Sequence, residues 1–384
     1  MSRIVVQKFG GSSLSDVEKI RKVARRVKER RDEGFSLVVV VSAMGDTTDE
    51  LLGLAKQVSA TPARRELDML LTCGERISMA LLSMALHELE VPAISFTGSQ
   101  SGIITDGAHS QARILEVRPE RIERAIAESK VVIVAGYQGV STTKEVTTLG
   151  RGGSDTTAVA LAAALGADCE IYSDVDGVFS ADPRVVPSAR KLDLVSFEEM
   201  HELSAAGAKV LNAQAVELAQ KQGIVIHARS THGGGTGTQI RASTPPSRVK
   251  GVTCDEAIWV LASTGVASAL LAVLDTHHLR PRMVLADRDG RTLAIVPLED
   301  VHGPEAVQAA LSRHVEVLDG LATVTCVGTG LSSEVSITLK ALGLAATLGC
   351  TPLLTYASTL QVTLVVPRET ARPLTRALHE ALVS

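Results

Sequence analysis

The chain has 384 residues, 45% of them apolar, which is enough for more than one hydrophobic core and suggests two or three domains. Its formal net charge is −4, no basic block is long enough to follow a nucleic-acid backbone, and aromatic residues, at 2%, offer little for base stacking. Nucleic acid is therefore excluded as an expected partner.

Cysteine usage and the N-terminus indicate a cellular compartment. The chain has five widely spaced cysteines without a CxxC pair, namely Cys73, Cys169, Cys254, Cys326 and Cys350. This pattern predicts reduced thiols, without disulfides or structural zinc. Residues 1–11 carry a lysine inside a short apolar strand, unlike a secretion signal, and we find no window with the ~18 apolar residues of a membrane span. We expect a cytoplasmic protein without membrane contact.

The first predicted element is a strand over residues 4–9, followed by a glycine-serine turn at 10–13 and a helix over about 15–31. Strand, glycine loop and helix are typical of a phosphate cradle. The pattern is not a P-loop, because Lys8 precedes the glycines. At the end of a strand, the Lys8 ammonium would face the oxygens of a transferring phosphate. The alternative is a surface lysine on an edge strand, which the flanking apolar residues and glycines disfavour.

Strands and helices then alternate along the chain. Strands are predicted at 37–41, 93–96, 102–105, 131–135 and 170–172, and helices at 49–58, 120–129 and 155–165. Apolar strands that alternate with helices predict an α/β fold with a mainly parallel sheet covered by helices. Such sheets bind ligands at the carboxyl ends of their strands, where the glycine-rich and hydroxyl-rich loops fall. Carboxylates in the loop after residue 173 lack the spacing of an EF-hand, so we expect no calcium site.

Residues 65–89 predict one or two helices that a glycine interrupts within residues 72–76. Glu75 lies at this interruption. Its carboxylate is either a solvated charge paired with Arg76 or a group that holds a substrate ammonium.

Residues 147–157 form the loop with the strongest functional signal, and a small apolar helix follows it. Gly152 and Gly153 allow a ligand to approach the backbone, and the helix start supplies free amides and a positive dipole end. Arg151 offers a planar fork for a carboxylate or phosphate, and Asp155 a negative charge one turn further on. The alternative is a glycine-rich turn with a solvated ion pair.

The first domain is predicted to end near Pro245-Pro246, after helices at 197–203 and 207–222 and a strand at 224–228. Beyond it, strands at 258–262, 283–286, 292–296 and 315–318 and helices at 266–278 and 304–313 spell βαββαβ. The pattern recurs without its last strand at 321–327, 334–348, 352–356, 360–366 and 369–382. We therefore predict three domains, 1–245, 246–319 and 320–384, the last two being ferredoxin-like modules.

Five motifs stand in the order and spacing typical of aspartokinases: Lys8-Phe9-Gly10-Gly11, residues 41–50, 65–68, 148–158 and 173–178. From Ser2 to about Ala242 the chain resembles an aspartate kinase of the amino-acid-kinase fold, and its tail resembles the paired ACT domains of that family. The resemblance implies that ATP phosphorylates the side-chain carboxylate of L-aspartate. The product would be 4-phospho-L-aspartate, in the first step toward lysine, threonine and methionine.

The resemblance also assigns roles. It implies that Lys8, Gly10 and Gly11 hold the ATP phosphates and that Asp155 positions Lys8 or the attacking carboxylate. Aspartate would be bound by Thr48 and Ser154, by Glu75 at its ammonium and by Arg151 at its α-carboxylate. The nucleotide site would extend to Phe9, Ser12, Ser173, Asp174, Phe179, Arg184, Lys209 and Val210. A carboxylate is ionised at neutral pH, so the reaction needs no general base, and Mg²⁺ would bridge phosphate oxygens.

The chain departs from the family pattern at Ser12, where Thr is usual, at Tyr137, in a motif that usually reads Gly-Phe-Gln-Gly, and at Phe179, where Tyr is usual. The hydroxyl missing from Phe179 would weaken nucleotide binding. In the tail, Ser263-Thr264-Gly265 replaces the usual Pro-Gly, and the loop at 328–333 is shortened. These changes predict weakened or altered feedback by lysine or threonine. The alternative role of the tail is dimerisation, and we expect a homodimer.

Two other functions remain open at this point. The chain would be a non-catalytic amino-acid sensor if its tail carried the function, although Lys8, Glu75, Arg151 and Asp155 together disfavour this. It would also be a kinase of the same fold with another acceptor, such as glutamate, carbamate or UMP.

Overall fold

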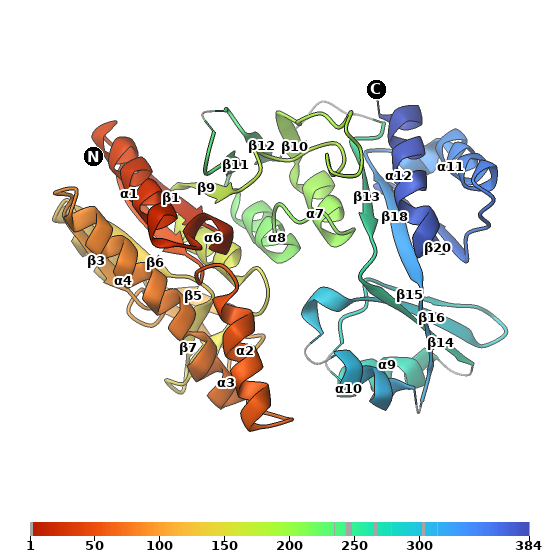
Figure 1. Ribbon diagram of the computed structural model, residues 1–384, viewed down its shortest axis with the longest axis horizontal. Coiled ribbons are helices and arrows are strands. Elements are labelled where there is room, and N and C mark those ends of the chain that lie inside the picture. The colour runs from red at the N-terminus through yellow and green to blue at the C-terminus, as the bar shows by residue number, and fades with distance from the viewer. Residues whose placement is uncertain are drawn as a thin grey trace. The chain divides into compact units, whose positions relative to one another are not determined.

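The computed structural model describes residues 3–233, 235–242, 248–264, 267–277, 279–301, 304–312 and 314–383. The chain divides into two compact units (Figure 1). The first comprises Met1–Val178, Lys191–His201 and Val210–Thr244, and the second Phe179–Arg190, Glu202–Lys209 and Pro245–Ser384. The second unit thus takes two segments from within the predicted first domain. The predicted boundary at Pro245-Pro246 lies outside the described residues.

An eight-stranded sheet is the centre of the first unit, in the order β10-β12-β11-β9-β1-β2-β6-β3. Its strands are β1 (Ile4–Phe9), β2 (Ser36–Val41), β3 (Ala93–Phe96), β6 (Val131–Ala135), β9 (Asp168–Ser173), β10 (Leu194–Ser196), β11 (Ile226–Ser230) and β12 (Thr238–Arg241). The pair β11–β12 is antiparallel and the other neighbours run parallel. The predicted α/β class with a mainly parallel sheet is therefore confirmed.

Successive residues of a strand face opposite sides of the sheet, and helices cover the apolar side chains on these sides. The helices up to residue 222 are η1 (Gly11–Leu14), α1 (Val17–Asp32), α2 (Thr47–Val58), α3 (Arg64–Leu71), α4 (Cys73–His87), α5 (Glu120–Ala127), α6 (Gly153–Leu165), α7 (Phe197–Ala205) and α8 (Ala213–Gln222). Helices α1 and α4 pack with Phe9, Val39 and Val41 in one core. Helix α6 packs against β1 and β2 and against α8. Lys8, which alternates with Phe9, faces the α6 side.

A second, four-stranded sheet lies within the first unit, in the order β5-β4-β7-β8. Its strands are β4 (Ile103–Thr105), β5 (Ile114–Val117), β7 (Gln138–Ser141) and β8 (Val146–Thr148). Of these strands only β4 was predicted. The other three are short, and their polar residues obscure the alternation of apolar and polar side chains that indicates a strand.

The predicted interruption within residues 72–76 is confirmed, although not at its glycine, and one other predicted helix boundary is wrong. The break between α3 and α4 falls at Thr72, whereas Gly74 lies inside α4 and allows close packing: a Cβ there would lie 2.7 Å from the Ala43 Cβ. The helix predicted over 207–222 begins only at Ala213 in α8. Asn212 caps it, its Oδ1 accepting from the amides of Gln214 and Ala215.

The second unit contains two antiparallel four-stranded sheets, β15-β16-β14-β17 and β13-β18-β20-β19. The strands are β13 (Gly251–Asp255), β14 (Ile258–Thr264), β15 (Met283–Ala286), β16 (Arg291–Pro297), β17 (Glu316–Leu318), β18 (Leu321–Val327), β19 (Leu354–Ala357) and β20 (Gln361–Pro367). The helices are α9 (Ala267–Thr276), η2 (Leu298–Asp300), α10 (Pro304–Leu311), η3 (Leu331–Ser333), α11 (Val335–Thr347) and α12 (Arg368–Leu382). Figure 1 shows α9 and α10 beside the first sheet and α11 and α12 beside the second.

Strand β13, which was not predicted, explains the incomplete second repeat. It precedes the first predicted strand of the first module, yet it pairs with β18, antiparallel from Gly251 with Val327 to Asp255 with Thr323. It therefore takes the place of the missing last strand. The two sheets also share a core made by Ile258, Val260, Ile295 and Val365.

Residues 64–87, which span α3 and α4, contain a window of mean hydropathy 1.4 that is long and apolar enough for a membrane span. Among the described residues it is the one such stretch, which corrects the expectation that none exists. Length and composition alone are weak evidence for a membrane span, since the core helix of a protein can be equally long and apolar. Helix α4 packs against α1 and buries Leu82 and Leu86 in a core.

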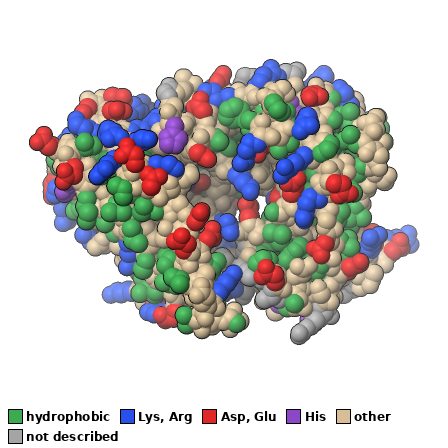
Figure 2. All heavy atoms as spheres, viewed as in Figure 1, with side chains coloured by type: hydrophobic (Ala, Val, Ile, Leu, Met, Phe, Trp, Pro, Cys, Tyr) green, Lys and Arg blue, Asp and Glu red, His purple; other side chains and the backbone are tan. Residues whose placement is uncertain are grey.

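On the face shown in Figure 2, basic and acidic side chains are interspersed.

Candidate active site

Lys8 is at the centre of the candidate site. It lies near the carboxyl end of β1, between β2 and β9, so the alternative of an edge-strand lysine is wrong. Its Nζ lies 2.7 Å from Asp155 Oδ1, in the first turn of α6. The ammonium also lies next to Gly10, the first residue of the loop that follows β1.

The loop after β1 is a close-packed glycine turn. A Cβ on Gly10 would lie 3.5 Å from the Lys8 Nζ, and one on Gly11 only 2.9 Å from the Ala43 carbonyl oxygen. The Gly45 amide donates to the Gly11 carbonyl at 3.1 Å, which joins this turn to the loop after β2. The loops after β1 and β2 thus pack closely at the carboxyl edge of the sheet, and Gly10 places no side chain next to the Lys8 ammonium.

Glu75 lies in the first turn of α4 and is buried, so the alternative of a solvated charge is wrong. Its Oε1 accepts from the Ala43 amide at 3.1 Å, and its Oε2 is buried without a hydrogen-bond partner. Burial raises the pKa of Glu75 to about 7, against the opposing effect of main-chain hydrogen bonds. A buried carboxylate oxygen without a partner is suited to a cationic ligand group.

The segment from Arg151 to Asp155 is held by a residue that the sequence analysis missed. Asn212 donates from Nδ2 to the Arg151 carbonyl at 3.2 Å and from its backbone amide to Asp155 Oδ2 at 3.3 Å. Gly152 has a left-handed φ of 69°, and a Cβ there would lie 2.3 Å from the Asn212 side chain. The N-cap position of α8 was a signal that would have located Asn212.

The other predicted substrate residues have distinct settings. Ser154 is buried beneath Gly136, where a Cβ would lie 2.9 Å from the Ser154 Oγ. Thr48 lies half-buried in the first turn of α2. The Arg151 side chain is exposed.

Tyr137 follows β6 and has a left-handed φ of 68°. Its carbonyl oxygen accepts a hydrogen bond from the Leu149 amide at 2.9 Å. Its ring packs over the start of α6, since a Cβ on Gly153 would lie 3.0 Å from the Tyr137 Cδ2. Burial raises the pKa of Tyr137 to about 12, and the hydroxyl is neutral at physiological pH. Tyr137 therefore belongs to the wall of the loop that carries Arg151.

The predicted nucleotide residues are divided between the units. In the first unit, the Phe9 side chain is fully buried and stacks on Tyr172 with ring centres 4.7 Å apart, which leaves only its main chain for a ligand. The Ser12 carbonyl accepts from Lys19. Ser173 is the last residue of β9, and Asp174 follows it at the carboxyl edge of the sheet. Val210 also belongs to this unit.

Three other predicted nucleotide residues, Phe179, Arg184 and Lys209, belong to the second unit. There the Arg184 guanidinium pairs with Asp182 at 2.8 Å.

Within the described residues, no group of three or more His, Cys, Asp or Glu side chains could hold a metal ion. A Mg²⁺ ion bound with a nucleotide would take most of its ligands from phosphate oxygens and water, as Mg²⁺ often does in nucleotide sites. A Cβ on Gly11 would lie 2.9 Å from the Ala43 carbonyl oxygen, so glycine is required where this turn packs on the loop after β2.

Comparison with known proteins gives concordant results. Residues 3–230 match the model of the amino acid kinase family. The chain is 44% identical to the aspartokinase of Mycolicibacterium smegmatis, over 98% of this chain and 96% of that protein. It is 46% identical to the aspartokinase of Mycobacterium tuberculosis H37Rv, with the same coverage.

Solved structures agree. The aspartate kinase from Synechocystis is 36% identical with a TM-score of 0.58, covering 99% of this chain and 69% of that one. Escherichia coli aspartokinase III is similar in fold at 24% identity, with full coverage of both chains. Its TM-score is 0.86 for the complex with aspartate and ADP and 0.78 for the complex with lysine and aspartate.

Proposed function

Since this chain belongs to the aspartokinases, within the amino acid kinase family, we infer that it transfers the terminal phosphoryl group of ATP to the side-chain carboxylate of L-aspartate. The products are 4-phospho-L-aspartate and ADP, and the reaction is the first step toward lysine, threonine and methionine. The observation that carries the proposal is the Lys8–Asp155 pair beside the Gly10-Gly11 turn, with the unpartnered Glu75 oxygen in the first turn of α4.

The chemistry that these residues supply is mainly electrostatic. The aspartate carboxylate is ionised at neutral pH, so an oxygen lone pair attacks the γ-phosphorus directly as the bond to the bridging oxygen of ADP breaks. Two anions must approach in line, and the Lys8 ammonium offsets their repulsion. Mg²⁺, when bound with the nucleotide, neutralises charge on the phosphate oxygens.

Four residues are proposed to contact the amino acid, and Asp155 acts through Lys8. Glu75 Oε2 accepts from the substrate ammonium, which also returns the Glu75 carboxylate to its ionised form. Arg151 forms a bidentate pair with the α-carboxylate. Asp155 keeps the Lys8 ammonium pointed at the transferring group through their 2.7 Å contact. Thr48 and Ser154 contact the remaining polar atoms of the substrate.

We propose separate roles for the predicted nucleotide residues. Lys8, Gly10 and Gly11 receive the phosphates with the main chain of Phe9 and Ser12. The adenosine and outer phosphates are assigned to Ser173, Asp174, Phe179, Arg184, Lys209 and Val210. Substitution of Phe179 by Tyr tests the last set, since the added hydroxyl should lower the KM for ATP.

The decisive test is product trapping. The purified protein, Mg-ATP and L-aspartate should give aspartyl hydroxamate when hydroxylamine is present, with ADP formed in equal amount. Glutamate, carbamate and UMP, offered in the same coupled ADP assay, should give little turnover. ATP binding without hydroxamate would contradict the proposal and favour a non-catalytic sensor, and preference for another acceptor would identify a different kinase of this fold.

We propose that feedback by lysine or threonine is weakened. An effector carboxylate would need free amides at the loop after β18, but the amides of Gly328 and Leu331 already donate to the carbonyls of Leu360 and Thr359, at 3.0 Å and 2.9 Å. A Cβ on Gly328 would lie 1.9 Å from the Arg248 carbonyl oxygen, so main chain fills this position. Titration of the kinase rate with lysine and threonine, singly and mixed, should show little inhibition at millimolar concentrations.

The chain is also proposed to be a cytoplasmic homodimer that associates through its tail. Exposed apolar side chains at Val335 and Leu339 lie one turn apart on α11. Sedimentation at several concentrations tests the dimer, and a monomer throughout would refute it.

A further inference from the structure

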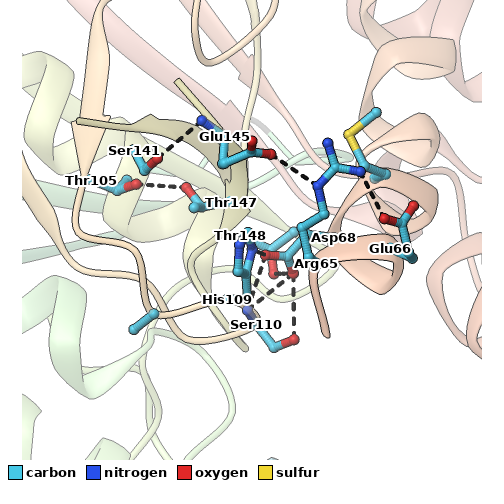
Figure 3. A network of polar contacts seen from close by, with 12 residues as sticks. Arg65, Glu66, Asp68, Thr105, His109, Ser110, Ser141, Glu145, Thr147 and Thr148 are labelled. Carbon is cyan, nitrogen blue, oxygen red and sulfur yellow. Dashed lines mark hydrogen bonds and ion pairs between the residues drawn. The ribbon is translucent and has the colours of Figure 1, made fainter. Parts of the chain in front are cut away.

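A second buried carboxylate, Asp68, lies in α3 and has no exposed surface. Three neighbouring residues donate to it (Figure 3). His109 Nδ1 lies at 2.7 Å and Thr148 Oγ1 at 2.7 Å. The Ser110 amide lies 3.0 Å and 3.1 Å from the two carboxylate oxygens, and the Ser110 hydroxyl at 3.4 Å. Asp68 therefore gathers two segments that are 42 and 80 residues away in sequence.

In this arrangement a single side chain, that of Asp68, fixes the positions of several neighbouring groups. An ionised carboxylate only accepts hydrogen bonds, and the donors on Asp68 satisfy both of its oxygens. Burial without these donors would be costly, so the His109–Ser110 loop and Thr148 are held where the carboxylate needs them. Removal of one donor leaves the others in place.

The segment held by Asp68 leads directly to Arg151. The Thr148 carbonyl accepts from the Ala112 amide at 2.9 Å, so this residue is fixed by its main chain and by its side chain. Two residues on, Gly150 has a left-handed φ of 77° and packs on the Ser110 carbonyl, 3.5 Å from where a Cβ would be. The backbone that presents Arg151 thus rests on groups that Asp68 orders.

We propose that Asp68 is a positioning residue for the substrate amino acid: through Thr148 and Ser110 it holds the loop that presents Arg151 to the substrate α-carboxylate. It touches neither substrate. The inference rests on the proposed function for the identity of the substrate, while the ordering of the loop is independent of it.

A matched pair of substitutions tests the proposal. Thr147 and Thr148 are neighbours in β8 and both are fully buried, but the Thr147 hydroxyl bonds Thr105 at 2.6 Å and not Asp68 (Figure 3). Thr148→Val should raise the KM for aspartate about tenfold, the order expected for loss of a hydrogen bond to a charged group, with the KM for ATP within about twofold of wild type. Thr147→Val should leave both constants within about twofold. Thr148→Ser should restore the wild-type value.

Asp68→Asn should raise the KM for aspartate at least as much, and Thr148→Val should add little in that background because both act on one hydrogen bond. If Asp68→Asn fails to fold, the comparison of Thr148→Val with Thr147→Val still tests whether Asp68 acts through Thr148. Equal effects of Thr148→Val and Thr147→Val on the KM for aspartate would overturn the proposal.

Hydrogen exchange separates this inference from the proposed function. Amides of residues 148–153 should exchange faster in Thr148→Val than in Thr147→Val, whichever acceptor the enzyme uses. Unchanged exchange there would refute the positioning role. Wild-type protein that forms no aspartyl hydroxamate, but in which the exchange difference persists, would refute the proposed function alone.

Discussion

Lys8 Nζ lies 2.7 Å from Asp155 Oδ1, and the two side chains retain only 14% and 9% of their exposed area. The contact joins the end of β1 to the first turn of α6, whose residues lie almost 150 positions later in the chain. A lysine side chain that is largely buried beside one carboxylate is held in a defined direction, which a solvated lysine side chain is not.

Lys8→Met should reduce kcat by at least about a hundredfold, the usual cost of removing a group that stabilises developing charge in a transition state. The assay is hydroxamate formation at saturating aspartate and Mg-ATP. Lys28→Met is a suitable control, because Lys28 pairs with Asp32 on the surface of α1 and should leave kcat unchanged. Full activity of Lys8→Met would exclude the proposed role.

Glu75→Gln should stabilise the free enzyme above pH 7 while abolishing aspartate binding. The folded pKa of Glu75, about 7, is raised above the ordinary value of 4.5. The stability this group contributes is therefore present below pH 4.5 and is lost as the pH rises through 7. The glutamine is neutral throughout and keeps the hydrogen bond from the Ala43 amide. We expect a gain on the order of 2–4 kcal/mol at pH 8.

Urea unfolding of both forms between pH 5 and 8 measures this effect, with aspartate binding followed by calorimetry. The wild type should lose stability relative to Glu75→Gln across this range. Parallel stability curves would show that the Glu75 pKa is ordinary. For the same reason, the affinity of the wild type for aspartate should fall as the pH drops below 7.

Gly152→Ala should lower kcat/KM for aspartate by about tenfold or more, because its Cβ would displace the Asn212 side chain from the Arg151 carbonyl. Gly166 is the matched control, since it ends the same helix at φ 58° and has nothing within 4 Å of a Cβ. Both alanines incur left-handed strain of about 1 kcal/mol. Comparable activity of the two variants would argue against a role for Asn212.

Glu170→Gln should destabilise the first unit by about 2–4 kcal/mol at pH 7, because it leaves Arg30 and Arg229 beside a buried neutral group. Burial alone would raise the pKa of Glu170, but the Gln7 hydrogen bond and the two arginines together lower it. This stability is present above pH 4.5 and is lost as the pH falls through the folded pKa.

Thermal unfolding between pH 3 and 7 checks the prediction, and the variant should show the shallower loss of stability in acid. The surface pair of Glu217 and Lys221 gives the control. Glu217→Gln should change stability by less than about 1 kcal/mol. Equal effects of the two substitutions would contradict the assignment of Glu170 as a buried ionic centre.

The sequence by itself determined the elements whose signal is local. Apolar runs bounded by glycine, proline or polar residues predicted β1, β3, β6, β15 and β18 at their observed ends. The order of the motifs that contain Lys8, Asp68 and Arg151 indicated the family before any tertiary contact was known. These features are read from neighbours in the chain, because side-chain periodicity and backbone propensity act over a few residues.

Only the tertiary structure decided which distant groups meet. Strand β13 pairs with β18 across some 70 residues, Asp68 collects donors from His109 to Thr148, and Asn212 reaches back to Arg151 and Asp155. No sequence pattern near any of these residues identifies the distant residue that it contacts. A buried carboxylate or amide is satisfied by whichever donors and acceptors the packed chain brings to it, and that choice depends on the pairing of whole elements.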